Sequence, residues 1–580
     1  MKRIELFIKS PIAMLILLIV LFIPAFADTI SVGYYPMHDD LQPMRQLIMD
    51  KCFKDLQIPC RWSEDLGFGF GYPLFNFYPP LPYLFGQVIH WIGFSFVDTV
   101  KVLVVLNFLV SGILMYILAK EFWGKRGGLI SAVFYVYAPY HAVDIYVRAA
   151  MNEAWALAFF PAVLWTIYKL IDTGRWIFVP FVALFTSFVM LSHNPTLMIF
   201  STLVLFWTFF WLAAKKNFKV FPKLLVSGVW ALGLAAFFTL PVIFEQKFVH
   251  VESLVIGYFN FLAHFTTLNQ LFISRFWGYG ASLFGPVDDL SFQVGHIHWS
   301  LSLISLFIAL LILRKKIILS VLIVMIFSLT AFYTFMSHQQ ASFIWEAIPV
   351  LQYLQFPWRF LTLTIFGTSF LAGSIALLSF PRMRESNSEP DSFNWIPAFA
   401  GMTLILATIF FYKDYFKWEK HWSWVDDAHK FSGELWKLQI TAGIFDYLPK
   451  GAKLPPPNPP EGDAKIVEGK GSVEKAFKNS IKQEYIVNME EKGIFQINTF
   501  YFPGWIYKVD GEKMEPQLEK ELGLPQFSLN SGIHKVSANL TNTPVRNLGN
   551  GLSSVSWLIL LILGGYKLKK NWKNLEHGKK

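Results

Sequence analysis

The sequence predicts a mainly α-helical, polytopic membrane protein of about twelve transmembrane helices with a small extracytoplasmic β-sandwich-like domain. Three observations predict this fold class. The 580 residues are 54% hydrophobic, and their mean hydropathy is +0.43. Charged residues make up only 16%, against roughly 25% in an average soluble domain. Basic residues also gather in alternate links between the apolar runs, as they do in polytopic membrane proteins.

The composition excludes several other classes of protein. A soluble enzyme and a disordered chain would both be far more polar. Two cysteines cannot cross-link 580 residues as they would a disulfide scaffold. The formal net charge of +10 does not by itself indicate nucleic acid, because basic residues of membrane proteins usually mark cytoplasmic loops. We therefore expect a lipid bilayer as partner and no nucleic acid.

The predicted spans are runs of about 17–25 apolar residues, which can cross a bilayer as helices. Twelve runs qualify, some shorter than ideal: 11–27, 98–119, 127–142, 154–171, 176–191, 196–214, 223–241, 297–313, 317–336, 359–380, 395–412 and 552–567. The first run has a second interpretation, because Ala25-Phe26-Ala27 also resembles the cleavage site of a signal peptide. The downstream topology is the same in either case.

Basic residues predict the orientation. Lys2, Arg3 and Lys9 precede the first run and assign the N-terminus to the cytoplasm. The even-numbered links and the C-terminal tail then fall on the same side. They contain Lys120, Lys125, Arg126, Lys169, Arg175, Lys215, Lys216, Lys219, Lys223, Arg314, Lys315, Lys316, Arg382, Arg384, Lys567, Lys569, Lys570, Lys573, Lys579 and Lys580. We therefore expect an integral membrane protein with both termini cytoplasmic.

The same topology defines three domains. Residues 1–412 are predicted to form a transmembrane domain with large outer loops at 28–97 and 242–296. Residues 413–551 are predicted to form an extracytoplasmic β-rich domain, and residues 552–580 to form the last helix and a basic tail. After a proline-rich linker the domain has strand-like stretches at 465–468, 484–488, 493–501, 505–509 and 533–540. An antiparallel β-sandwich fits them, and its expected role is to cover or shape a site.

Three smaller features remain in the loops. Cys52 and Cys60 either form a disulfide, which is permitted outside the cytoplasm, or stay as free thiols. Residues 84–94 are predicted to form a helix in the membrane interface. Residues 382–402 resemble a late insertion without a function of their own.

The first candidate site is His38-Asp39-Asp40 in the first outer loop. A carboxylate at the outer membrane surface suits a general base that deprotonates an acceptor hydroxyl or amine. Adjacent side chains point in different directions, so we expect only one carboxylate to enter a site. The alternative is a solvated acidic turn.

The second candidate lies between the third and fourth spans. Asp144 and Arg148 are four residues apart, on one face if the segment is helical, and Glu153 lies near the start of a span. Arginine suits a phosphate, and ionisable residues near membrane depth suggest function. The alternative is a salt bridge that holds a helix end.

Further polar groups lie at other outer helix ends. His193 sits between the fifth and sixth spans, and Arg359 opens the tenth, where it could hold a lipid phosphate or simply extend to the interface. His296 and His298 form too weak a pattern for a metal site, so no metal ligands are assigned. The sequence has no P-loop, GxSxG, HExxH or CxxC motif.

Several segments, in this order, carry a resemblance. They are "GYPLFNFYPPLPY", "APYHAVDIYVRAAMNEAWA", "LSHNPT", "LAAFFTLPVIFE", "LQFPWRF" and "FPGWIYKVDG". Over nearly the whole chain except 382–402, the sequence resembles the bacterial membrane proteins labelled "6-pyruvoyl-tetrahydropterin synthase-related", of the broad GT-C superfamily of polytopic glycosyltransferases. Nothing resembles the soluble pterin enzyme, so neither a pterin nor a nucleotide cofactor is expected.

The resemblance implies an inverting enzyme that transfers a sugar from a polyprenyl-phosphate donor on the outer membrane face. An acidic residue of the first outer loop would act as base, and Asp39 fits that position best, with Asp40 second. Asp144, Arg148 and Glu153 fall where the second outer loop contributes to the site. Some relatives bind a divalent cation there, but neither loop here has an Asp-x-Asp pair, so metal dependence stays open.

The sequence therefore predicts a membrane glycosyltransferase of the cell envelope that acts on a glycan, lipid or protein acceptor. Its candidate catalytic residues are Asp39, Asp40 and Glu153, and its candidate donor- or phosphate-binding residues are Asp144, Arg148, His193 and Arg359. Two alternatives from other classes remain. One is a transporter or flippase for lipid-linked glycans, which favours charges in mid-span. The other is an assembly protein built around the β-domain, in which the loop carboxylates are dispensable.

Overall fold

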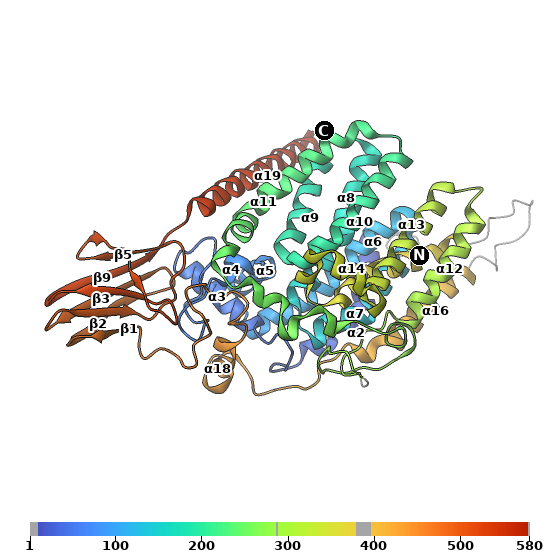
Figure 1. Ribbon diagram of the computed structural model, residues 1–580. Helices are drawn as coiled ribbons and strands as arrows, with labels where there is room; N and C mark the ends of the chain where they lie inside the picture. The colour runs from blue at the N-terminus through green and yellow to red at the C-terminus, as the bar shows by residue number, and fades with distance from the viewer. Residues whose placement is uncertain (1–9, 286–287, 379–395, 578–580) are drawn as a thin grey trace, which may run out of the picture. The chain divides into compact units, whose positions relative to one another are not determined.

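The computed structural model describes residues 10–285, 288–378 and 396–577, without the side chains of 396–400 and 566–577 (Figure 1). The chain forms two compact units. The first comprises Met1–Gln42, Val97–Val226 and Val255–Asp426. The second comprises Pro43–Phe96, Ser227–Leu254 and Asp427–Lys580. Each unit thus collects segments that are far apart in the sequence.

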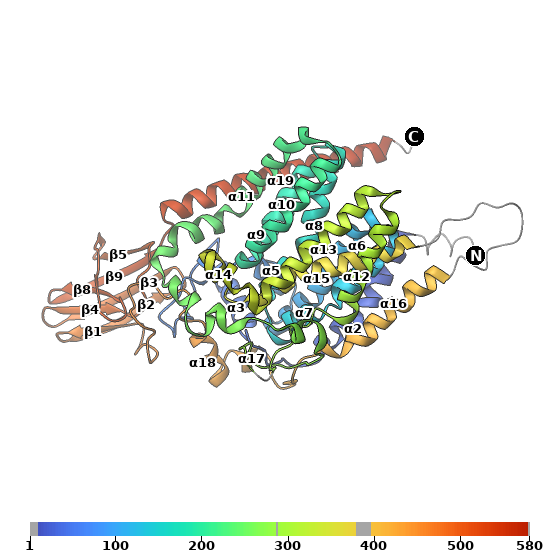
Figure 2. The ribbon, with the colours of Figure 1, turned by 45° about the vertical axis from the view of Figure 1, so that its right-hand side comes forward.

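Helices dominate the first unit (Figure 2). They are α2 (Pro11–Phe26), α6 (Phe96–Val136), α7 (Pro139–Ala142), α8 (Met151–Thr173), α9 (Phe178–Ser192), α10 (Asn194–Ala214), α12 (His296–Ile312), α13 (Ile317–Ser337), α14 (Ser342–Ala347), α15 (Leu361–Ala372) and α16 (Ile396–Tyr412). Short 3₁₀ and π turns make up much of the described chain between Gln246 and Ile273.

Within the part of the chain that the structure describes, each predicted span falls mainly on helix. Among the described residues, eight helical segments are long and apolar enough to cross a membrane, which makes the chain an integral membrane protein. The long helix α6 contains two predicted spans, which are separated at Gly124, where the backbone leaves the helical conformation (φ 72°, ψ 178°). Helices α9, α12 and α16 are the remaining, shorter ones. The predicted run 127–142 is interrupted after Val136, since Pro139 cannot continue a helix.

Helices α8 and α15 form the core of the first unit. In the most apolar stretch of each span, 83% of the residues are buried in Met151–Thr173 and 78% in Pro357–Leu378. Phe160 of α8 stacks on Phe200 of α10 with ring centroids 3.9 Å apart. Glu153 lies in the first turn of α8, and Arg359 lies just before α15. The packing of these two central helices therefore fixes the positions of both candidate residues.

The second unit combines helices with two β-sheets. Its helices are α3 (Gln42–Lys54), α4 (Leu74–Phe77), α5 (Leu81–Trp91), α11 (Phe221–Glu245), α17 (Asp427–Lys430), α18 (Gly433–Thr441) and α19 (Pro544–His577). Helices α11 and α19 run side by side in both views, and Trp230 Nε1 donates to the carbonyl of Ser556 (Figures 1 and 2). Helix α19 starts eight residues before the predicted run, because the prediction rested on the apolar stretch and the first turns of the helix precede that stretch. The predicted helix at 84–94 is present as α5, and Cys52 is bonded to Cys60.

The strands form two antiparallel sheets, in the orders β1-β4-β8-β7 and β2-β3-β9-β5-β6. The strands are β1 (Ala464–Glu468), β2 (Gly471–Lys478), β3 (Lys482–Met489), β4 (Gly493–Ile497), β5 (Trp505–Val509), β6 (Glu512–Lys513), β7 (Gln517–Leu518), β8 (Pro525–Leu529) and β9 (Gly532–Leu540). Side chains of both sheets share one core, in which Tyr485 of β3 contacts Phe495 of β4. The predicted antiparallel sandwich is therefore confirmed.

Candidate functional site

The link between α6 and α8 has an unusual backbone. Val143–Val147 forms a π-helical turn, a rare conformation that is frequent at functional sites. Ala149 then adopts a left-handed conformation (φ +51°), which costs free energy for a residue with a Cβ atom. The strained link places Asp144 and Arg148 beside the first turn of α8.

Arg148 is the centre of a buried cluster, here called the arginine cluster, which consists of Asp144, Arg148, Glu153 and Arg359. Its Nη1 donates to Asp144 Oδ1 and, at 3.0 Å, to Glu153 Oε2. The guanidinium also lies over the Trp358 ring, 4.4 Å from the centroid, in a cation–π contact. The sequence-predicted pair of Asp144 and Arg148 is thus in contact, with Glu153 as a third member.

Arg359 reaches the same carboxylate from the chain segment before α15. Its Nε lies 3.4 Å from Glu153 Oε2, and its Nη1 donates to the Leu354 carbonyl at 2.6 Å. Gln355, which accepts a further bond from Nη1 at 3.1 Å, is the second left-handed residue beside the cluster (φ +63°). The side chains of Glu153 and Arg359 are only 1% and 9% exposed, so the charges neutralise one another in a dry environment.

Burial and the negative charge of Glu153 raise the pKa of Asp144 well above its usual range, although Arg148 opposes that shift. The Asp144 Oδ2 atom accepts no hydrogen bond from the described residues. Asp144 therefore protonates more readily than an ordinary aspartate. When it does, the cluster has two guanidinium groups against one carboxylate.

Asp39 and Asp40 are half-buried in a turn that runs along the strained link. The backbone N–H of Asp39 donates to the Arg148 carbonyl at 3.1 Å. Gln42 Nε2 donates both to Asp39 Oδ2 at 3.1 Å and to the Ala149 carbonyl at 2.7 Å, so it fixes the carboxylate against the link. The backbone of the first predicted site is thus hydrogen-bonded to that of the second.

His193 precedes α10 and donates to or accepts from Thr196 Oγ1 at 2.6 Å. Burial, with the positive charges of Arg359 and Arg148, lowers its pKa to about 3. The imidazole is therefore neutral at physiological pH, and it can meet a phosphate only as a hydrogen-bond partner.

Sequence reasoning missed three side chains of the site. Tyr140 donates to Glu153 Oε1 at 2.8 Å and accepts from Arg148 at 3.2 Å, Trp358 stacks on Arg148, and Gln42 holds Asp39. Tyr140 precedes Asp144 and Arg148 by one and two helical turns, a spacing that could have revealed it. Gln42 follows Asp39 by three residues and Trp358 directly precedes Arg359, but no pattern in the sequence marks either as a member of the site, so only the fold reveals them.

A divalent cation requires several carboxylate or imidazole ligands that converge on one point. Among the described residues, no three His, Cys, Asp or Glu side chains gather at one point. Asp144 and Glu153 are held by arginines, and His296 and His298 contact the carbonyls of Ile273 and Phe134 at 3.0 and 2.9 Å. The residues present do not fit a metal ion.

The second unit contains a comparable buried group, here called the tether triad, which consists of Arg61, Glu245 and Arg546. Arg546 Nε donates to Glu245 Oε2 at 2.9 Å, and both side chains are at most 2% exposed. Arg61 donates to the Phe237 carbonyl at 3.0 Å and to Asn550 at 2.8 Å. The triad connects the first outer loop with α11 and α19.

Comparisons with known proteins give distant likenesses. No family model matches the chain. A stretch of 203 residues is 27% identical to a protein of Lactococcus lactis subsp. cremoris that is described only as an uncharacterized protein, and it covers 33% of each chain. The label "6-pyruvoyl-tetrahydropterin synthase-related" therefore stays a resemblance of sequence motifs.

Three solved structures are also similar. They are the apo oligosaccharyltransferase of Archaeoglobus fulgidus (11% identity, TM-score 0.43), the mycobacterial arabinofuranosyltransferase AftD (14%, 0.42) and ArnT from Cupriavidus metallidurans bound to undecaprenyl phosphate (14%, 0.38). The likenesses cover 70%, 69% and 69% of this chain and 56%, 26% and 64% of the others. The chain thus spans less than two thirds of the length of each, and the function has to be inferred from the site itself.

Proposed function

We propose that the protein is a membrane glycosyltransferase that moves a sugar from a polyprenyl-phosphate donor to an acceptor on the extracytoplasmic face. One observation carries the proposal: a half-buried carboxylate, Asp39, is hydrogen-bonded through its own backbone to the link that presents Arg148. A base and a phosphate-binding cation are the two groups that such a transfer requires from a protein. No nucleotide site is needed, because the glycosyl-phosphate bond already stores the energy.

The arginine cluster suits a lipid-linked phosphate. Arg148 and Arg359 approach Glu153 from two different segments. Both guanidinium groups lie at helix ends and not in mid-span, which is where the phosphate of a membrane-bound lipid would be. Arg359 Nε makes no hydrogen bond to the described residues and could donate one to a phosphate oxygen. Glu153 and Asp144 then orient the two cations, and Trp358 packs against the Arg148 guanidinium.

Asp39 is the proposed general base. In an inverting transfer the acceptor hydroxyl oxygen attacks C1 of the sugar, and Asp39 takes the hydroxyl proton. The bond between C1 and the phosphate oxygen breaks with its electron pair on that oxygen, and the guanidinium groups stabilise the new charge on the polyprenyl phosphate. Gln42 keeps Asp39 in position by its bond to Oδ2. Asp40 supports the turn, and Glu153 is an orienting residue.

The transporter alternative fits these observations less well. A carrier of charged lipid-linked substrates would favour ionisable groups near the middle of the spans. Here Glu153 occupies the first turn of α8, and Arg359 precedes α15. An assembly protein without chemistry would need neither the strained link nor a base beside it.

A comparison of lipid extracts tests the proposal. Cells that lack the protein should accumulate a polyprenyl-phosphate sugar, and wild-type protein should remove it on re-expression. Protein with Asp39→Asn, expressed to the same level in the membrane, should leave the accumulation in place. Accumulation that the Asp39→Asn protein relieves fully would remove Asp39 as base, and no accumulation in the deletion strain would contradict lipid-linked sugar transfer.

A further inference from the structure

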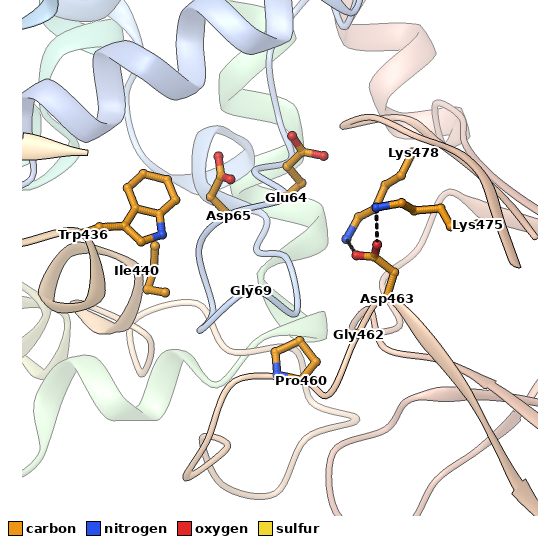
Figure 3. Close-up of a pocket in the computed structure, with 10 residues that line it drawn as sticks. All are labelled: Glu64, Asp65, Gly69, Trp436, Ile440, Pro460, Gly462, Asp463, Lys475 and Lys478. Atoms are coloured by element: carbon orange, nitrogen blue, oxygen red, sulfur yellow. Dashed lines mark hydrogen bonds and ion pairs between the residues drawn. The ribbon is translucent and has the colours of Figure 1, made fainter. Parts of the chain in front are cut away.

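The second unit has a polar pocket of about 410 Å³, and none of its lining residues belongs to the candidate catalytic set (Figure 3). It is lined by Glu64, Asp65, Gly69, Trp436, Ile440, Pro460, Gly462, Asp463, Lys475 and Lys478. Its volume lies in the roughly 300–1,000 Å³ range of small-molecule sites. The lining comes from the first outer loop, from α18 and from the start of the β-domain, so a fold is required to assemble it.

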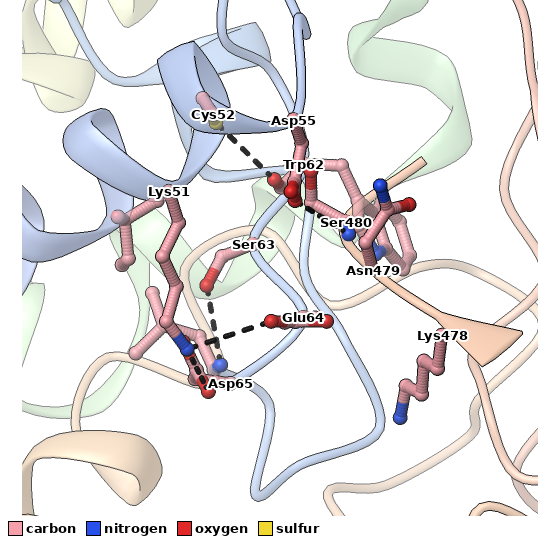
Figure 4. Close-up of polar contacts among 12 residues, drawn as sticks. Lys51, Cys52, Asp55, Trp62, Ser63, Glu64, Asp65, Lys478, Asn479 and Ser480 are labelled. Atoms are coloured by element: carbon pink, nitrogen blue, oxygen red, sulfur yellow. Dashed lines mark hydrogen bonds and ion pairs between the residues drawn. The ribbon is translucent and has the colours of Figure 1, made fainter. Parts of the chain in front are cut away.

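The charged side chains of the pocket are paired. Asp463 accepts from Lys475 at 2.8 Å and from Lys478 at 2.6 Å on one wall (Figure 3). Lys51 reaches Asp65 at 2.7 Å and Glu64 at 3.4 Å on the other (Figure 4). Lys51 does not line the pocket itself, but with it three carboxylates are matched by three lysines, and the formal charge of this group of six is zero.

A pocket whose formal charges cancel when Lys51 is counted, and which has many hydrogen-bonding groups, favours a particular kind of ligand. A phosphate would need an excess of cations, and a metal ion would need an excess of carboxylates. A neutral ligand rich in hydroxyl groups finds both donors and acceptors here. Burial and the neighbouring charge of Asp65 raise the pKa of Glu64, so this carboxyl is closer than usual to serving as a donor as well.

The pocket also has an apolar wall. Trp436 is half-buried, and Phe431 supports its ring edge-on with the centroids 6.3 Å apart. Ile440 and Pro460 complete this wall. One face of a pyranose ring carries mainly C–H groups, which pack on an indole face while the hydroxyl groups turn to polar residues.

The frame of the pocket is fixed by the backbone. Phe68 N–H donates to the Ile440 carbonyl at 2.9 Å, which joins the first outer loop to α18. Ser480 N–H donates to Asp55 Oδ2 at 2.9 Å, which joins the same loop to the β2–β3 hairpin (Figure 4). Gly69 has a φ of +90°, and a Cβ atom there would stand 3.4 Å from the Pro460 ring. A preformed pocket of this kind loses little entropy when it binds.

We propose that this pocket binds a sugar residue of a neutral glycan, with Trp436 under the ring and Glu64, Asp65, Asp463 and Lys475 around its hydroxyl groups. The proposal goes beyond sugar transfer, because binding here requires neither a donor nor the proposed base. Glycan binding could therefore persist in an Asp39→Asn protein that transfers nothing.

Saturation-transfer NMR and calorimetry on the full-length protein test the proposal. The protein should be held in lipid nanodiscs or an amine-oxide detergent, because maltoside detergents are themselves glycans. The probes are maltohexaose, cellohexaose, mannohexaose and chitohexaose at millimolar concentrations. At least one should bind saturably, and Trp436→Ala should weaken it by about tenfold, the factor expected for loss of one aromatic contact.

Two further variants make the result specific. Trp424→Ala removes a 58% exposed tryptophan of the first unit and should leave glycan affinity unchanged. Lys475→Gln alters a half-exposed lysine of the pocket and should weaken binding even if Trp436→Ala proves unstable. The proposal is overturned if none of the four oligosaccharides saturates the protein, or if Trp436→Ala and Lys475→Gln bind like wild type. It is also overturned if inorganic phosphate binds at this site and only that binding responds to Lys475→Gln.

Discussion

The arginine cluster and the tether triad are both buried groups of charges, but their partners differ. In the triad, Glu245 accepts from Arg546, from Asn76 at 2.8 Å and from Thr543 at 2.5 Å. Arg61 donates to two fixed acceptors, the Phe237 carbonyl and Asn550. These partners belong to the first outer loop, α11 and α19, so the bonds close a junction between segments.

The arginine cluster instead lies on a strained backbone. Ala149 and Gln355 are both left-handed, the π turn precedes Arg148, and Asp39 stands half-buried next to the link. Backbone strain of this kind costs roughly 1–3 kcal/mol for each residue and persists where the fold over-determines it. Both groups bury their charges, so burial does not distinguish them; the strained backbone and the adjacent half-buried carboxylate do, and on these we base the proposal that the arginine cluster is the functional site.

The largest expected effect concerns the orientation of the membrane helices, because a reporter fused to a loop reads either the cytoplasmic or the extracytoplasmic side. The basic links predict that both groups lie at extracytoplasmic helix ends. Reporter fusions at Lys216 and Arg314 should read cytoplasmic, and a fusion at Gly511 should read extracytoplasmic. A cytoplasmic signal at Gly511 would reverse the map and leave both groups on the wrong side for a lipid-linked donor.

The base is the next most sensitive position. Asp39→Asn keeps the shape of the side chain but cannot accept the acceptor proton. Turnover should fall by about 10²–10⁴-fold while donor affinity changes little. Asp40→Asn is the matched control and should cost less than about tenfold. If the two effects are reversed the base is Asp40, and if both proteins keep full activity then Glu153 is the next candidate.

The tether triad should respond in stability and not in donor binding. Glu245→Ala leaves Arg546 buried without its carboxylate, which typically costs about 3–5 kcal/mol. Thermal unfolding in nanodiscs should show this loss, and the folded fraction should bind donor normally. A Glu245→Ala protein that unfolds like wild type but loses donor binding would contradict the comparison, since the triad would then be a ligand site.

The sequence predicted much of the fold. The apolar runs predicted the helices of the described residues, because a helix needs about 20 apolar residues to cross a bilayer. The pattern was weaker in the β-domain, where β2, β8 and the two-residue strands β6 and β7 were missed. The residues of β2 are mostly exposed, so its sequence has no clear alternation. Strand β8 has only five residues and starts at a proline, a residue that is depleted in strands although their first position tolerates it. Segment 382–395 lies outside the described residues, so its prediction as an insertion stays untested.

The candidate site was predicted only where its members are close in the sequence. The spacing of Asp144 and Arg148 predicted their contact because four residues span one helical turn. Nothing local could reveal that Glu153 bridges to Arg359, some 200 residues later, or that Gln42, three residues after Asp39, also donates to the distant Ala149 carbonyl. Such contacts depend on how distant segments pack in the folded protein, which has no signature in a single sequence. The roles of these residues in catalysis stay predictions.

Donor affinity should fall more modestly when the cluster loses a cation. Arg148→Gln removes one guanidinium, and a hydrogen bond to a charged group contributes about 1.5–3 kcal/mol, or about 10–100-fold in affinity. Arg275→Gln is the matched control, because Arg275 stacks on Phe411 in the same unit, outside the cluster. Equal donor affinity in the Arg148→Gln and wild-type proteins would assign Arg148 to a purely structural salt bridge.

The smallest effect concerns pH. The raised pKa of Asp144 means that its protonated form is favoured in the folded state. Its contribution to stability is therefore present below the unfolded value, near 3.9, and is lost as pH rises through the raised value. Protonation also gives the cluster a net positive charge, whereas a donor phosphodiester keeps its own charge over the same range. Donor affinity should thus rise severalfold as pH falls from neutrality.

Asp144→Asn isolates this effect, because it mimics the protonated aspartate at every pH. The variant should bind donor at neutral pH as tightly as wild type does at low pH, and its affinity should be flat across the range. Titration of donor binding at several pH values measures both slopes. A variant that keeps the wild-type pH dependence would assign it to another group, and one that loses donor binding would show that the Asp144 carboxylate is needed to hold Arg148. The second outcome would make the cluster resemble the tether triad, in which each charge serves to hold another.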